Sequence, residues 1–384
     1  MVSREDSFML YASEKQQILR NILLVCIWLI VVNGYALLAL NRLNVTPDSA
    51  FPWINPKIFK TEHKWNLIKL HAKWDSYWFL DVAKNGYYMR GENEFANVVF
   101  FPLYPLGVRL VGLLTGGNLI LAGWILSSLC LLASVVLLTR LVQRFHPNID
   151  PLWPTIFLLI FPTAFFLNAV YSEAMFLMFS IAMFYFAIQR RFWMAACCAA
   201  LASATRMAGV FLFFPLFVEF IQANGWRALF TRSVLPLGIA PAGALAFFLY
   251  HYVKFGDFLL YLKVERWWGR DFSGDIDDLD QIVTHSGITN WILEWGFTIF
   301  GFAAAIAVLW KLRRSYGIYM IVSMAIAFAS GGTFGIGRYC MVLFPTYLLA
   351  ASIESIPAKS AWVLTSSLFL ALNTLLFVNT YWAG

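Results

Sequence analysis

The sequence predicts an all-helical protein that crosses a lipid bilayer many times and forms a single integral membrane domain over residues 1–384. Hydrophobic residues make up 60% of the chain, only 13% of the residues are charged, and the mean hydropathy is +0.69. A soluble domain carries charge on roughly a quarter of its residues. This composition therefore excludes an ordinary water-soluble globule.

Apolar runs long enough to cross about 30 Å of hydrocarbon recur along the chain. The first run follows a charged N-terminal segment and lacks a small-residue cleavage site, so we interpret it as a retained span rather than a signal peptide. About eleven transmembrane helices are predicted in this way, at residues 20–41, 119–140, 152–168, 170–189, 192–206, 207–223, 233–253, 288–310, 317–331, 339–355 and 360–382.

One further apolar segment, 98–115, is interrupted by Pro102, Pro105 and Gly107 and carries Arg109, so it fits either a span or a helix lying in the membrane interface. The distribution of basic residues decides between these alternatives. If the segment does not cross, every short loop rich in arginine and lysine lies on the same side as the N-terminus, as the positive-inside rule requires. These loops hold Arg140, Arg144, Arg190, Arg191, Arg227, Arg232, Lys311, Arg313, Arg314 and Lys359.

The predicted topology therefore has a cytoplasmic N-terminus and two long external loops. Residues 42–118 form the first loop, which contains interfacial helices and the densest polar chemistry, and residues 254–287 form the second. The membrane is the plasma membrane in a bacterium or archaeon and the endoplasmic reticulum in a eukaryote.

Two classes of function fit this topology: a transporter, and a membrane-embedded enzyme acting on a lipid-borne substrate at the outer face. No internal repeat is evident, and the ionisable residues gather at the predicted outer ends rather than the midplane, which disfavours a transporter. The sequence lacks a GxxxxGK[ST] phosphate loop, HExxH and GxSxG. The net charge of +7 reflects membrane topology, because no basic run with interleaved aromatics indicates nucleic-acid binding.

A dense motif occurs in the first external loop. Residues 73–81 read KWDSYWFLD, followed by Gly86-Tyr87-Tyr88 and by the FFPLYP stretch at 100–105. This pattern resembles the PIG-V-like mannosyltransferases of the GT-C class of membrane glycosyltransferases. The matching positions are Trp74, Asp75, Leu80, Ala83, Gly86, Tyr87, Phe101, Pro102 and Pro105.

The resemblance continues in order along the chain with FPTAFF at 161–166, YSE at 171–173, TRMAG at 205–209 and GRY at 337–339. Two positions depart from the family pattern. Lys73 stands where the family more often has arginine, which keeps the positive charge but loses the planar fork. Trp78 stands where the eukaryotic members tend to have histidine.

The resemblance implies transfer of a hexose, expected to be mannose, from a polyprenyl-phosphate carrier to an acceptor hydroxyl on the outer or lumenal face. Such a transfer needs a carboxylate that accepts the hydroxyl proton, for which Asp75 is the candidate, and a single displacement implies inversion at the anomeric carbon. Cations must stabilise the departing lipid phosphate. The predicted substrate-binding residues are Lys73, Trp74, Trp78, Tyr87, Glu92, Glu94, Tyr104, Glu173, Arg206 and Arg338.

Each assignment has a plainer alternative. Asp75 could instead form an ion pair with Lys73 or cap a helix. Glu173 could lie in the first turn of a helix whose N-cap residue is Ser172, where the helix dipole favours a carboxylate. Arg206 and Arg338 could equally extend to the lipid headgroups, and Glu92 and Glu94 could be solvated acids of a loop. The aromatic residues are as suitable for anchoring in the headgroup region as for packing against a sugar.

The expected partners are the polyprenyl-phosphate sugar donor, a lipid or glycan acceptor and the bilayer, without nucleic acid. No dedicated metal site is predicted in the sequence, and the role of a divalent metal ion as cofactor is left open. Two alternatives to the transferase remain, a transporter or flippase of lipid-linked saccharides and a partner-dependent subunit of a glycan-assembly complex.

Overall fold

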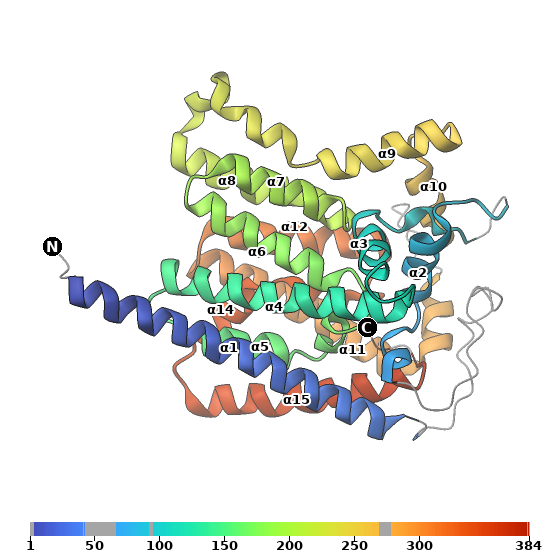
Figure 1. Cartoon of the computed structure of the whole chain (residues 1–384), viewed down its shortest axis with the longest axis horizontal. Coiled ribbons are helices and arrows are strands. Elements are labelled where there is room, and N and C mark those ends of the chain that lie inside the picture. The colour runs from blue at the N-terminus through green and yellow to red at the C-terminus, as the bar shows by residue number, and fades with distance from the viewer. Residues whose placement is uncertain are drawn as a thin grey trace.

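The computed structural model describes residues 4–40, 42, 67–91, 95–268, 278–381 and 383. All regular secondary structure in these ranges is helical, so the predicted all-helical membrane class is confirmed. The helices run side by side in a bundle, and short helices gather at one end of it (Figure 1).

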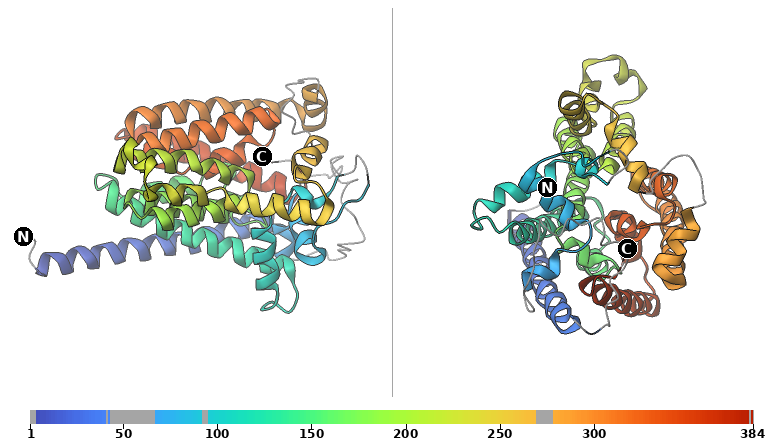
Figure 2. Two further views of the ribbon diagram at one scale, coloured as in Figure 1. Left: turned by 90° about the horizontal axis from the view of Figure 1, so that it is seen from above. Right: turned by 90° about the vertical axis from the view of Figure 1, so that its right-hand side faces the viewer.

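Five helices in the described part are long and apolar enough to cross a membrane, and a sixth crossing arises if a bent pair, η7 (Arg232–Ile239) and α9 (Ala242–Phe255), forms one span. The right-hand view in Figure 2 looks at this bundle of helices from one end. The five segments are Ser13–Ala39 of α1 (Arg4–Ala39), α4 (Leu119–Phe145), Met207–Asn224 across η5 (Met207–Leu212) and α8 (Phe213–Asn224), Trp291–Lys311 of α11 (Asp278–Lys311), and α15 (Ile356–Val378).

Other predicted spans are shorter or interrupted. The 152–168 run is divided into α5 (Leu152–Leu159) and η4 (Ala164–Leu167), and the 339–355 run into α13 (Ile336–Val342) and α14 (Pro345–Ala351). The remaining helices of the bundle are α6 (Glu173–Ile188), α7 (Phe192–Ser203) and α12 (Arg314–Gly331). The total of eleven transmembrane helices therefore stays a prediction.

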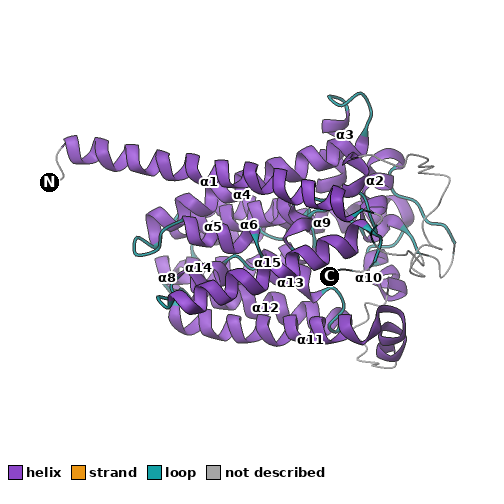
Figure 3. Cartoon of the chain, turned by 90° about the horizontal axis from the view of Figure 1, so that it is seen from below, coloured by secondary structure: helices purple, strands orange, loops and turns teal. Residues whose placement is uncertain are grey.

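The proline-containing segment near residue 105 forms the short helix α3 (Leu103–Gly112), which lies at the edge of the bundle next to a loop drawn in teal (Figure 3). Ten helical residues extend about 15 Å, half the thickness of the hydrocarbon core, so this helix is too short to cross. Tyr104 and Val108 are buried, whereas Leu106 and Leu110 are exposed. This two-sided pattern is typical of a helix lying in the membrane interface.

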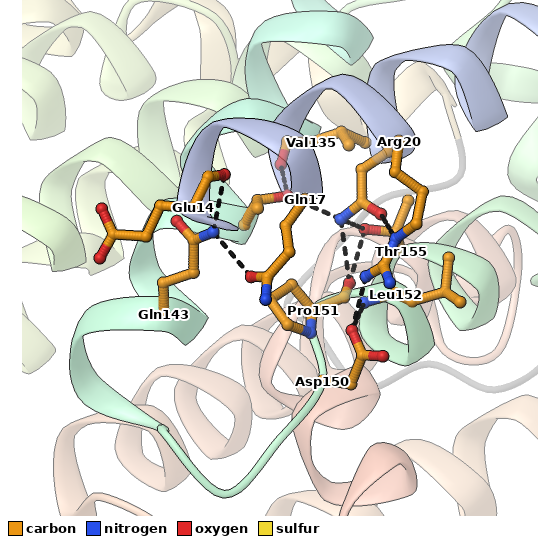
Figure 4. A network of polar contacts seen from close by, with 11 residues as sticks. Glu14, Gln17, Arg20, Val135, Gln143, Asp150, Pro151, Leu152 and Thr155 are labelled. Carbon is orange, nitrogen blue, oxygen red and sulfur yellow. Dashed lines mark hydrogen bonds and ion pairs between the residues drawn. The ribbon is translucent and has the colours of Figure 1, made fainter. Parts of the chain in front are cut away.

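A polar network joins α1, α4 and α5 at the end of the bundle away from α2 (Ser76–Asn85) and α3 (Figures 1 and 4). The buried Asn21 Nδ2 lies 2.9 Å from Thr139 Oγ1 and 3.2 Å from Thr155 Oγ1, and donates to both. Arg20 forms an ion pair of 2.6 Å with Asp150. Because buried amides are costly without partners, these bonds specify how the three helices align.

Candidate active site

Four charged side chains from distant parts of the sequence meet near the end of the bundle that carries α2. Asp75 precedes α2, Glu173 begins α6, Arg206 precedes η5, and Arg338 lies in α13. Arg338 Nη1 is 2.7 Å from Asp75 Oδ2 and 3.9 Å from Glu173 Oε1, while Arg206 Nη1 is 2.6 Å from Glu173 Oε1. We call these four residues the charge cluster.

The charge cluster is formally neutral and mostly shielded from solvent. The exposed fraction of the side chain is 2% for Glu173, 7% for Arg338 and 14% for Arg206, but 25% for Asp75. Opposite charges in such a site interact more strongly than in water, because the surroundings screen them less. Asp75 is the member of the cluster that an incoming molecule reaches most readily.

The backbone around Asp75 adopts a constrained turn. Trp74 has a φ of +52°, in the left-handed region, which costs a non-glycine residue roughly 1–2 kcal/mol. Three hydrogen bonds stabilise the turn. Trp74 Nε1 donates to the Tyr381 carbonyl at 3.2 Å. The Tyr171 hydroxyl accepts from the Asp75 amide at 3.2 Å and donates to the Lys73 carbonyl at 3.1 Å.

Asp75 stands at the N-cap position of α2, yet its side chain makes no capping hydrogen bond. The carboxylate binds Arg338 instead of Lys73 or the helix terminus. Burial lowers the pKa of Lys73, and the charge of nearby Lys69 lowers it further. The structure thus directs the Asp75 carboxylate towards the charge cluster.

The positions of Glu173 and Arg206 in the charge cluster are set by a helix start and by a close backbone contact. α6 begins at Glu173, where a carboxylate is favoured by the helix dipole, and Ser172 occupies the N-cap position without a side-chain bond. Gly209 lets η5 pack against the end of α7, because a Cβ at this position would lie 2.2 Å from the Ala202 carbonyl carbon. Arg206 is thereby brought to Glu173.

Aromatic rings cover both arginines. The Arg338 guanidinium carbon lies 5.6 Å from the centre of the Tyr171 ring and 5.4 Å from that of Phe166, and the Arg206 guanidinium carbon lies 5.1 Å from that of Tyr339. These distances allow cation–π attraction. The three aromatic residues belong to the quoted motifs, but the sequence alone assigned them no role.

The predicted aromatic binding residues lie in packed surroundings. The Tyr104 hydroxyl is 2.8 Å from Ser127 Oγ, and the Tyr87 hydroxyl donates to the Phe100 carbonyl at 2.6 Å. Trp78 is buried against Phe100 and Trp268, with Arg90 above its ring. Their roles towards a substrate stay predictions.

Glu92 and Glu94 lie outside the described residues. Within the described part of the chain, no group of three or more His, Cys, Asp or Glu side chains is arranged to hold a metal ion.

We expect the Tyr171→Phe substitution to lower turnover several-fold. It should also lower the free energy of unfolding by about 1–3 kcal/mol, because two hydrogen bonds are lost and each contributes roughly 0.5–1.5 kcal/mol. The lost hydroxyl bonds the backbone on both sides of Trp74. Kinetic assays and thermal melting in detergent measure the two effects. Tyr316→Phe is the control, since this buried hydroxyl contacts His146. Equal turnover of the two variants would contradict a role for Tyr171 at Asp75.

The fold is similar to that of a solved structure. ArnT from Cupriavidus metallidurans, crystallised with undecaprenyl phosphate, superposes with a TM-score of 0.51 at 14% sequence identity, over 92% of this chain and 64% of the ArnT chain. The chain thus spans less than two thirds of the length of ArnT. The two chains therefore share a fold.

The chain belongs to the PIG-V mannosyltransferase family. The model of this family matches residues 15–252. The matched range includes Asp75, Glu173 and Arg206, while Arg338 lies beyond it. No curated protein matches the chain.

Proposed function

We propose that the protein transfers mannose or a related hexose from a polyprenyl-phosphate carrier to an acceptor hydroxyl on the outer or lumenal face of the membrane. Membership of the PIG-V family supports a mannosyltransferase, and the ArnT structure contains a polyprenyl phosphate. The observation that carries the proposal is the convergence of a partly exposed carboxylate, Asp75, with Arg338 and Arg206 in one cluster.

In the proposed reaction, the acceptor hydroxyl oxygen attacks the anomeric carbon of the donor. The Asp75 carboxylate accepts the hydroxyl proton, the bond between the anomeric carbon and the phosphate oxygen breaks, and the lipid phosphate leaves with the bonding electrons. One displacement inverts the anomeric configuration. Arg338 and Arg206 stabilise the charge that grows on the phosphate.

The contact between Arg338 and Asp75 suggests how donor binding prepares the base. Arg338 Nη1 lies 2.7 Å from Asp75 Oδ2. A donor phosphate competes for the same guanidinium, and its binding releases the carboxylate towards the acceptor. Glu173 Oε2 is buried and has no hydrogen-bond partner among the described residues, so it is available to accept a hydrogen bond from a sugar hydroxyl.

The remaining sequence candidates belong to the same proposal. Lys73 supplies a third cation near the phosphate, and the aromatic side chains of the first loop line the path of the sugar or anchor it among the headgroups. These side chains, together with the two loop acids that the structure does not describe, are Trp74, Trp78, Tyr87, Tyr104, Glu92 and Glu94.

The test is release of polyprenyl phosphate from a panel of polyprenyl-phosphate sugars by purified protein in lipid vesicles. We expect release from the mannosyl donor, accelerated by an acceptor lipid or glycan, and none from heat-inactivated protein. Failure of every donor with correctly folded protein would contradict the proposal. Movement of intact lipid-linked sugar across the vesicle would then indicate a flippase, and activity restored by a partner protein would indicate a subunit of a complex.

A further inference from the structure

We propose that Glu294 is a positioning residue that sets the location of Arg338; the inference rests on the proposed function, in which Arg338 binds the donor phosphate. Glu294 lies in α11, and its side chain belongs neither to the charge cluster nor to the family motifs. It is buried, with 5% of its surface exposed. A carboxylate in such a place needs specific partners to offset its loss of hydration.

The segment before Arg338 is rich in glycine and bends twice. α12 ends at Gly331 and α13 begins at Ile336. Gly332 and Gly335 have φ values of +59° and +70°, which glycine adopts without steric cost. Because glycine restricts the backbone so little, the position of this segment depends on contacts with the rest of the protein.

Glu294 supplies such contacts on the N-terminal side of Arg338. Its Oε1 accepts a hydrogen bond from the Gly335 amide at 3.2 Å, and its Oε2 accepts one from Thr333 Oγ1 at 3.4 Å. Thr333 is buried as well. Hydrogen bonds that a carboxylate accepts are stronger than those between neutral groups. The Glu294 side chain therefore joins both bends of the segment to α11.

Contacts at Gly337 add to this support. Thr163 Oγ1 donates to the Gly337 carbonyl at 3.0 Å. A Cβ at Gly337 would lie 3.0 Å from the ring of Phe297, which also belongs to α11. Arg338 follows immediately, so both Glu294 and Phe297 determine where its guanidinium stands relative to Asp75.

The expected result of Glu294→Ala is a loss of turnover of about 10–100-fold, because a displacement near 1 Å reduces catalysis on this scale. Binding of undecaprenyl phosphate, used as the probe, should weaken in parallel. Glu294→Gln should recover most of both, since an amide oxygen accepts from Gly335 and the amide nitrogen donates to the Thr333 hydroxyl. Thr298→Ala is the matched control: its buried hydroxyl donates to the Glu294 backbone carbonyl of the same helix.

A double-variant comparison tests whether Glu294 acts through Arg338. In an Arg338→Gln background, Glu294→Ala should cause no further loss of turnover or of probe binding. Losses that multiply, or equal losses in Glu294→Gln and Glu294→Ala, would overturn the positioning role.

Hydrogen exchange separates the inference from the proposed function. Amides of residues 331–340 should exchange faster in Glu294→Ala than in the wild type or in Thr298→Ala. Unchanged exchange would overturn the role of Glu294 whatever the activity. If the wild type releases no lipid phosphate from any donor, the proposed function fails, but this exchange measurement still decides whether Glu294 holds the segment.

Discussion

The Asp75→Asn variant is expected to fold normally and to lose about 10²–10⁴-fold in sugar transfer, the usual effect of removing a general base. Asparagine has nearly the same shape, and its amide oxygen still accepts a hydrogen bond from Arg338, which lies 2.7 Å from the carboxylate. The amide cannot accept the proton of the acceptor hydroxyl. The loss should therefore fall on kcat, whereas binding of the lipid donor should change little.

The measurement is the initial rate of polyprenyl phosphate release with saturating donor and acceptor, together with thermal melting in detergent. Asp257→Asn is the matched control, because Asp257 is a carboxylate of the loop before α10 (Leu260–Glu265) and pairs with Lys263. We expect this control to turn over like the wild type. Near-normal turnover by Asp75→Asn would exclude Asp75 as the base.

The second large effect is expected for Arg338→Gln, which should weaken donor binding and destabilise the protein together. Removal of this guanidinium leaves Asp75 and Glu173 with Arg206 as the remaining cation of the charge cluster. Breaking a buried ion pair from one side typically costs about 3–5 kcal/mol in unfolding free energy. The donor phosphate also loses a charged hydrogen-bond donor, so KM for the donor should rise and kcat should fall.

Kinetics in lipid at a temperature below the melting point of the variant separate the two effects. Arg313→Gln is the control, because Arg313 makes two hydrogen bonds to the largely buried Glu219 at 3.1 and 2.9 Å, away from the charge cluster. Both variants should melt earlier than the wild type. If Arg313→Gln reduced transfer as strongly as Arg338→Gln, the effect at Arg338 would be a matter of stability alone.

Local rules predicted much of the fold and several site residues. Hydropathy indicated the membrane class, and the proline-interrupted segment is indeed the short helix α3. The helix start at Glu173 also lies where its sequence pattern indicated. These features depend on residues within one or two helical turns of each other, so they can be predicted from the sequence pattern.

The breaks within two predicted spans could not be predicted from hydropathy. The runs 152–168 and 339–355 are continuous in hydropathy, but each is divided into two short helices. The breaks expose backbone and side-chain groups for long-range bonds, such as the one from Thr163 to Gly337. Hydropathy averages over a window and does not record where a helix must end to let another segment approach.

The sequence by itself determined the class of protein, because a bilayer requires long apolar helices whose backbone bonds are satisfied internally. It also named the four charged residues at the centre of the proposed site. Only the tertiary structure decided their partners: Asp75 binds Arg338, 263 positions away, rather than nearby Lys73. The attraction between charges depends on distance in space and on burial, and both are set by how the helices pack.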